Sequence, residues 1–180
     1  MKIGIITPMA EEKISLLAAL SDTKTKQHGG TEITTGRYKN HEVILTESGI
    51  GKVAAASATT VMIDNFKPDL VVNTGSAGAL DPALKIGDEV VGTRIAYSDV
   101  DDTVFGYDFG QLPNKPLYYE ADINTVADFE QLTAVKKGLI VSGDQFVQDE
   151  AKQRILSHFP DALVAEMEAA AVAQVAYQFN

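Results

Sequence analysis

Short apolar segments bounded by turns alternate along this chain with segments in which apolar residues keep helical spacing. Residues 1–7, 69–74 and 138–142 are rich in apolar and β-branched residues and run into turn residues, as buried strands do. Residues 9–20 and 52–66 instead have apolar or small residues at helical intervals. Strands that alternate with helices are typical of an α/β fold with a largely parallel sheet, and we expect that fold class here.

The remaining segments complete this alternation and add one hairpin. Further strands are expected at residues 31–38, 42–47, 89–97 and 162–165, and further helices at residues 123–132, 150–159 and 167–179. Turn residues join the first two of these strands into a hairpin, which makes the sheet mixed but mostly parallel. Because 180 residues suit one domain, we expect a single α/β domain over residues 1–180 with helices flanking one central sheet.

The acidic composition limits the kinds of partner. The chain carries 15 Lys and Arg against 25 Asp and Glu, a formal net charge of −10, whereas nucleic-acid binding needs a basic patch. Anionic membranes are disfavoured for the same reason, and no apolar run approaches the roughly 18 residues of a membrane span. Cysteine is absent, which excludes disulfides, thiolate zinc sites and a cysteine nucleophile and fits a cytoplasmic protein.

Two glycine-containing motifs fail the tests for phosphate binding and for serine catalysis. Residues 49–52 look like the tail of a phosphate-binding loop, but Thr46 stands where that loop needs glycine and Val53 where it needs Ser or Thr. Ser76 lies in a Thr-Gly-Ser-Ala-Gly run that is not a nucleophile elbow, because Thr74 takes the first glycine position.

A metal site is not expected either. The histidines are isolated, with neither helical nor hairpin metal spacing. The acidic cluster at residues 99–102 lacks the glycine and the terminal Glu of a calcium loop. We therefore expect no metal and no cofactor.

Carboxylates and aromatics gather where the expected strands end, which is where ligands bind in open α/β sheets. The strand ends carry Met9, Glu12 and residues 48–51, 75–78, 142–146 and 166–168. The carboxylates are Glu12, Asp144, Glu166 and Glu168, and the aromatics are Phe105, Tyr107 and Phe146. With few basic side chains nearby, this set indicates a neutral, partly aromatic ligand with hydroxyl groups, such as a nucleoside or a sugar. A helix-start acid remains the alternative interpretation for Glu12 and for one of Glu166 and Glu168.

A set of stretches in a fixed order resembles one protein family over essentially the whole chain. They are MKIGII at residues 1–6, ESGIGKV at 47–53, NTGSAG at 73–78, FGYDFGQ at 105–111, GLIVSGD at 138–144 and EMEA at 166–169. On these stretches the sequence is similar to the bacterial 5′-methylthioadenosine/S-adenosylhomocysteine nucleosidases, within the nucleoside phosphorylase-like superfamily. The resemblance implies that fold and hydrolysis of the bond between adenine and an alkylthio-ribose, through an oxocarbenium-like transition state.

The resemblance also implies roles for individual residues. Glu12 would be the general base that activates the attacking water, and Glu168 would bind the ribose 2′- and 3′-hydroxyls. Phe146 would stack on adenine, and the Val147 backbone would bond the edge of that base. The other pocket residues are Met167 on the ribose, Ser76, Ala77 and Gly78 around the base and sugar, and Met9 and Ile50 around the alkylthio group.

The family is dimeric, so the resemblance further implies a homodimer that acts on a small nucleoside. In that dimer Phe105, Tyr107 and Pro113 would reach into the pocket of the neighbouring subunit.

The sequence departs from the family pattern at several internal positions. Residues 7–8, Thr-Pro, replace a small Gly-Ala pair, and Ser98 stands where a His is usual. Asp102 stands where the family has an aliphatic residue facing the alkylthio group. The segment 122–136 is several residues shorter than in the family, as if a helix were trimmed.

The largest departure concerns the carboxyl end. In the family one more core strand follows, ending in Arg-Ala-(Ile/Met/Val)-Ser-Asp, and then a closing helix. The Asp of that motif is the acid that protonates the leaving adenine, and no residue up to Asn180 matches it, since Asp144 lies elsewhere in the pattern. We therefore expect a nucleosidase domain that is incomplete at its C-terminus. Loss of the acid would slow adenine release by roughly 10²–10⁴-fold.

Two other functions stay open at this point. The first is a catalytically impaired adenine-nucleoside binder, which the unmatched acid motivates. The second is a phosphorylase of the same superfamily, which needs a phosphate site. The arginines are Arg37, Arg94 and Arg154, and none lies in the candidate turns.

Overall fold

The computed structural model describes residues 1–132 and 134–179, and the chain divides into two compact units. The first unit comprises residues 1–76 and the chain from residue 171, and the second comprises residues 77–170. Each unit contains a five-stranded sheet with parallel strand pairs at its centre.

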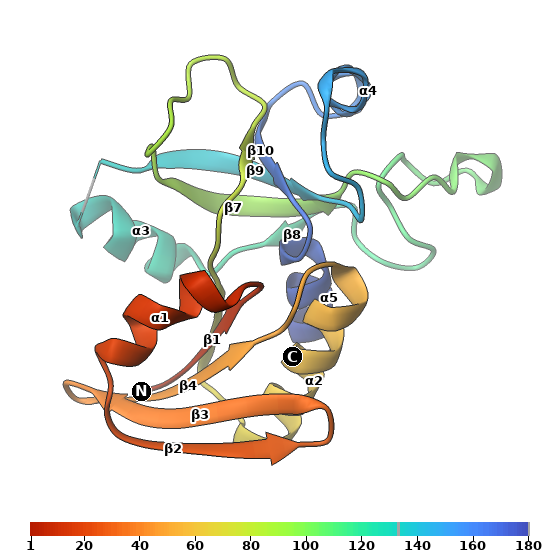
Figure 1. Ribbon diagram of the computed structural model, residues 1–180. Coiled ribbons are helices and arrows are strands. Elements are labelled where there is room, and N and C mark those ends of the chain that lie inside the picture. Colours follow the sequence, from red (N-terminus) through yellow and green to blue (C-terminus); the bar gives the residue numbers. More distant parts are fainter. Residues whose placement is uncertain (133, 180) are drawn as a thin grey trace. The chain divides into compact units, whose positions relative to one another are not determined.

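The first unit alternates strands and helices. Its elements are β1 (Lys2–Thr7), α1 (Ala10–Ala18), β2 (Ser21–His28), β3 (Thr31–Tyr38), β4 (His41–Glu47), α2 (Lys52–Phe66), β5 (Leu70–Asn73) and most of α5 (Ala169–Phe179). The strand order is β2-β3-β4-β1-β5, with β1 parallel to both β4 and β5 and with β2, β3 and β4 antiparallel (Figure 1). The carboxyl ends of β1, β4 and β5 therefore lie at one edge of the sheet.

The core of the first unit lies between its sheet and its helices. Ile6, Ile44 and Met62 are fully buried, and they cluster with Ile33, Ala55, Ala171 and Val172. The small residues of α2 allow this helix to approach the sheet closely, since bulky side chains would hold it away. The strand β1 is hydrogen-bonded along both edges, to β4 and to β5, and α1 follows it directly.

The second unit holds the remaining elements. They are β6 (Gly78–Ala79), β7 (Val90–Tyr97), the 3₁₀ turn η1 (Thr103–Phe105), β8 (Tyr119–Glu120), α3 (Ile123–Leu132), β9 (Lys136–Ser142), α4 (Asp149–His158) and β10 (Ala162–Glu166). The strand order is β6-β10-β9-β7-β8, with β7, β9 and β10 parallel and the two short edge strands antiparallel. The ends of β9 and β10 are neighbours, because Ser142 and Glu166 are register partners.

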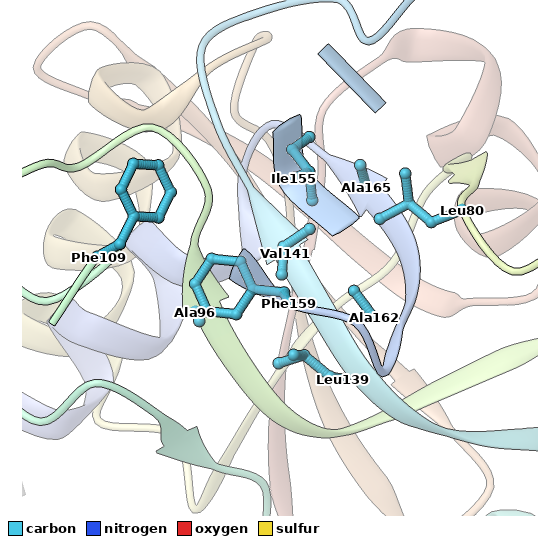
Figure 2. Packing of buried hydrophobic residues seen from close by; sticks show 9 residues of the cluster. All are labelled: Leu80, Ala96, Phe109, Leu139, Val141, Ile155, Phe159, Ala162 and Ala165. Carbon is cyan, nitrogen blue, oxygen red and sulfur yellow. The ribbon is translucent and has the colours of Figure 1, made fainter. Parts of the chain in front are cut away.

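Side chains from β7, β9, β10 and α4 meet in the core of the second unit, with Phe109 from the loop after β7 (Figure 2). Leu139, Val141 and Ala96 are fully buried, and Phe159 is 2% exposed. Burying a side chain of the size of leucine or phenylalanine stabilises a fold by about 1.5–3 kcal/mol.

The expected α/β class and the mixed strand pairing are confirmed. Residues 52–66 and 123–132 form α2 and α3 with the expected bounds, and the expected hairpin is β3 and β4. The strands, expected in one central sheet, pair in two sheets among the described residues. This difference arises because β5 pairs with β1, whereas β7, β9 and β10 pair among themselves.

One strand of full length was not expected. The segment of β2, SDTKTKQH, contains no apolar residue, and all but its last residue are exposed, so it lacks the alternation that predicts a strand. It forms because β3 supplies backbone partners along its length. Its lysines sit on a sheet edge, where charge discourages pairing with other chains.

Candidate active site

The carboxylate of Glu12 is fixed at the carboxyl edge of the first sheet. Its Oε1 accepts hydrogen bonds from the Ser76 backbone N–H at 2.8 Å and from the Ser76 hydroxyl at 2.9 Å. Its Oε2 accepts a weaker bond of 3.2 Å from the Met9 backbone N–H. Glu12 is therefore an acid in the first turn of α1 and also a carboxylate held against the loop after β5.

Gly75 makes this approach possible. A Cβ at this position would lie 3.1 Å from both carboxylate oxygens of Glu12 and 3.2 Å from their carbon. Such contacts are tighter than most real Cβ contacts, so a larger residue would push the carboxylate away from Ser76. The absence of a side chain at Gly75 thus leaves room for the carboxylate of Glu12.

The structure therefore brings three of the predicted residues together, namely Met9, Glu12 and Ser76. Met9 is partly buried and precedes α1. Ile50 lies in the turn between β4 and α2 and is 60% exposed, so its side chain is accessible.

In the second unit, Glu166 and Ser142 form a network where β9 and β10 end. Oε1 of Glu166 accepts a short hydrogen bond from the Ser142 hydroxyl. Oε2 accepts bonds from the backbone N–H groups of Glu168 at 2.8 Å and Ala169 at 2.7 Å. Ser142 Oγ in turn accepts a 2.8 Å bond from the Ala170 N–H. Burial raises the pKa of the Glu166 carboxyl, and the hydrogen bonds from Ser142, Ala169 and Glu168 oppose that rise.

This network settles which of the two glutamates caps the helix. Glu166 binds the first N–H groups of α5, which begins at Ala169 rather than at residue 167 as expected. Glu168 is 4% exposed, and its Oε2 accepts a 3.3 Å bond from the Met167 N–H. Met167 is partly buried. The capping role therefore belongs to Glu166.

The segment after β9 carries the residues expected around the base. Phe146 is 81% exposed, and Val147 is partly buried against the second core. Gly78 lies in β6 as the register partner of Ala165 in β10, and Ala77 precedes it. An exposed aromatic ring beside a strand end is suited to stacking on a flat ligand.

The loop after β7 is anchored at Phe109 and has exposed residues both before and after it. Phe109 stacks on His158 of α4 with ring centroids 3.8 Å apart. Phe105 is 75% exposed and Tyr107 is partly buried, while Pro113 is exposed. The departures Ser98 and Asp102 lie in the same loop: Ser98 is 9% exposed, and Asp102 is partly buried where η1 begins.

The side chain of Asp99, just after β7, binds the backbone of Asp144 after β9. Oδ2 of Asp99 accepts a 2.9 Å hydrogen bond from the Asp144 N–H. Burial, together with Tyr119, Asp99 and Asp144, raises the pKa of Tyr97 well above its usual range. Asp144 therefore helps to shape the loop.

Within residues 1–132 and 134–179, no three metal-binding side chains come close enough together to hold an ion. Across those residues, none of the helices has the length and hydropathy that crossing a membrane requires.

Sequence reasoning missed the partners of the predicted carboxylates. The bonds from Ser76 to Glu12 and from Ser142 to Glu166 join residues 64 and 24 positions apart, a separation that local patterns do not detect. Parallel pairing of β1 with β5 and of β9 with β10 is the signal that would have predicted both.

Comparisons with known proteins agree with this architecture. The model of the phosphorylase superfamily matches residues 2–180. The 5′-methylthioadenosine/S-adenosylhomocysteine nucleosidase of Staphylococcus aureus (strain NCTC 8325) is 45% identical over 185 aligned residues, covering 99% of this chain and 81% of that protein.

Solved structures give the same result. The S-adenosylhomocysteine nucleosidase of Streptococcus pyogenes, in complex with methylthiotubercidin, is 44% identical with a TM-score of 0.97, covering 99% of this chain and 78% of that one. The nucleosidase of Streptococcus pneumoniae with a transition-state inhibitor is 43% identical with a TM-score of 0.97, covering 100% and 81%. This chain therefore belongs to the phosphorylase superfamily, among its 5′-methylthioadenosine/S-adenosylhomocysteine nucleosidases.

Proposed function

We propose that this chain hydrolyses the N-glycosidic bond of 5′-methylthioadenosine and of S-adenosylhomocysteine, releasing adenine and the alkylthio-ribose. The observation that carries the proposal is the 45% identity to nucleosidases of that name over 99% of the chain. The fixed carboxylate of Glu12 supplies the chemistry that such a reaction needs.

Glu12 is the proposed general base. Ser76 occupies Oε1 with two hydrogen bonds, whereas Oε2 accepts only the 3.2 Å bond from Met9 among the described residues. Oε2 is therefore the oxygen better able to take a proton from water. A positioned base of this kind contributes about 10²–10⁴-fold to a rate.

Glu168 is the proposed ribose ligand. A carboxylate can accept hydrogen bonds from both the 2′- and the 3′-hydroxyl, and charged acceptors hold such donors more strongly than neutral ones. In the same proposal Met167 packs on the ribose, Phe146 stacks on adenine and the Val147 backbone bonds the edge of the base. Ala77 and Gly78 line the base and sugar, as Ser76 does.

We further propose a homodimer. Phe105 is 75% exposed and the neighbouring Val104 is 83% exposed, and large apolar side chains exposed side by side often mark a protein contact. In the dimer Phe105, Tyr107 and Pro113 serve the pocket of the partner subunit, and Met9 and Ile50 line the alkylthio group.

The test is adenine release from 5′-methylthioadenosine, measured with and without inorganic phosphate. We expect adenine and methylthioribose at a rate that does not depend on phosphate. A methylthioribose 1-phosphate product that forms only with phosphate would identify a phosphorylase instead. Binding of methylthiotubercidin without any adenine release would identify a binder that does not catalyse.

A further inference from the structure

The start of α5 is held by a closed set of hydrogen bonds around two side chains from neighbouring strand ends. Glu166 is the last residue of β10 and Ser142 is the last residue of β9, and the two are register partners. The N–H groups of Glu168, Ala169 and Ala170 all donate to these two side chains, at 2.8, 2.7 and 2.8 Å. Ser142 is fully buried. The backbone on both sides of the Glu168 side chain is therefore tied to the sheet.

The charge of Glu166 matches this arrangement. Its carboxylate receives the Ser142 hydroxyl and two backbone N–H groups, and all of them are donors. A negative charge is also stabilised at the amino end of a helix. A glutamine here would turn one acceptor into a donor and break part of the set. The network is thus specific for a carboxylate.

We propose that Glu166, together with Ser142, is a positioning residue that fixes the backbone from which Glu168 presents its carboxylate to the ribose hydroxyls. The inference rests on the proposed function, because Glu168 is a ribose ligand only there. Neither Glu166 nor Ser142 needs to touch the substrate. Binding groups lose effect when displaced by more than about 0.5 Å, so the support of Glu168 determines how well it binds the diol.

The test compares three ligands: methylthiotubercidin, its 2′-deoxy analogue and adenine. The affinity of each ligand is measured by calorimetry. Comparing the three affinities distinguishes the contribution of the ribose from that of the base. The wild type should prefer the ribonucleoside over the deoxy analogue by roughly 10–100-fold, the size expected for hydrogen bonds to a charged group. Glu168→Gln should reduce that preference directly.

Ser142→Ala and Glu166→Gln should lower the preference for the ribonucleoside by roughly tenfold while leaving adenine affinity unchanged. Glu150→Gln is the matched control, since Glu150 is an exposed first-turn acid of another helix, α4. It should leave all three affinities unchanged. Thermal unfolding of each variant checks that it is folded. If Glu166→Gln does not fold, Ser142→Ala alone tests the proposal.

The outcomes separate this inference from the proposed function. If the wild type prefers the ribonucleoside, and folded Ser142→Ala or Glu166→Gln keeps the full preference, the positioning role is wrong while the function stands. If the variants lower the affinity for adenine as much as the affinity for the nucleoside, the network supports the fold in general, and the inference is also wrong. If the wild type binds neither nucleoside, the proposed function fails and the inference fails with it.

Discussion

The Glu12 carboxylate lies where a side chain at position 75 would press on it. A Cβ at Gly75 would lie 3.1 Å from both oxygens, so Gly75→Ala should displace the carboxylate of the proposed base by a few tenths of an ångström. We expect adenine release to fall about tenfold, because small displacements of a catalytic group are costly. The control is Gly30→Ala, where an added Cβ meets nothing within 4 Å. Equal turnover in the two variants would show that Gly75 does not position Glu12.

The partly buried Glu166 should make the free energy of unfolding depend on pH. Burial raises its pKa, so between the ordinary glutamate value of about 4.3 and the raised value the folded chain holds a proton that the unfolded chain has released. The free energy of unfolding therefore falls as pH rises through this window. Glu166→Gln removes that titration and should flatten the profile. Urea unfolding at a series of pH values measures the free energy of unfolding as a function of pH. Parallel pH profiles for the wild type and the variant would contradict this prediction.

At the scale of single residues, the sequence indicated which carboxylates follow strand ends but not which groups hold them. Glu12 and Glu168 were expected as carboxylates at strand ends, and the structure places Glu12 against Ser76. The support of each carboxylate was not predicted, because Gly75 and Ser142 show their importance only through contacts made in three dimensions. The sequence had left open which of Glu166 and Glu168 begins the helix, and hydrogen bonds were needed to decide it.

Among the elements, the central strands, the helices and the edge strand β5 were predictable, whereas the edge strands β2, β6 and β8 were not. β1 and β9 carry apolar, buried residues that distinguish them. β2 is polar throughout, while β6 and β8 are two residues long. Such edges form because a neighbouring strand offers unpaired backbone groups, which a single-sequence pattern does not contain.

The loop after β7 depends on a glycine that packs against its surroundings. Gly110 has φ of +90°, and an added Cβ would lie 2.5 Å from Tyr97 O and 2.7 Å from Phe159 Cζ. Gly110→Ala should lower the free energy of unfolding by about 2–4 kcal/mol, from backbone strain and overpacking together. Gly106→Ala is the control, because φ is +85° there but an added Cβ meets nothing within 4 Å. Chemical denaturation should show a larger loss of unfolding free energy for Gly110→Ala than for Gly106→Ala. Equal losses in the two variants would contradict the packing role of Gly110.

At the scale of the whole molecule, the proposed homodimer can be tested through its exposed loop. Changing Val104 and Phe105 together to serine should shift a dimer toward monomer, because it removes two exposed apolar side chains. The control is Ile86→Ser, a fully exposed apolar residue elsewhere in the second unit. Sedimentation velocity measures the mass, and a wild type that is monomeric at every concentration would contradict the dimer.

The fold class and the family could be predicted from the whole sequence, whereas the division of the strands could not. The order of the matched stretches indicated the nucleosidase family, which the 45% identity supports. The choice between one sheet and two depends on which strand β5 pairs with. That choice is made by long-range backbone contacts, which apolar patterns leave open.

We propose that this chain is a nucleosidase whose general base is Glu12. The most direct measurement is adenine release from 5′-methylthioadenosine by the wild type and by Glu12→Gln, with methylthiotubercidin affinity measured on the same preparations. We predict release by the wild type, a loss of about 10²–10⁴-fold in Glu12→Gln, and an affinity that is largely kept. Normal turnover by Glu12→Gln would contradict the account.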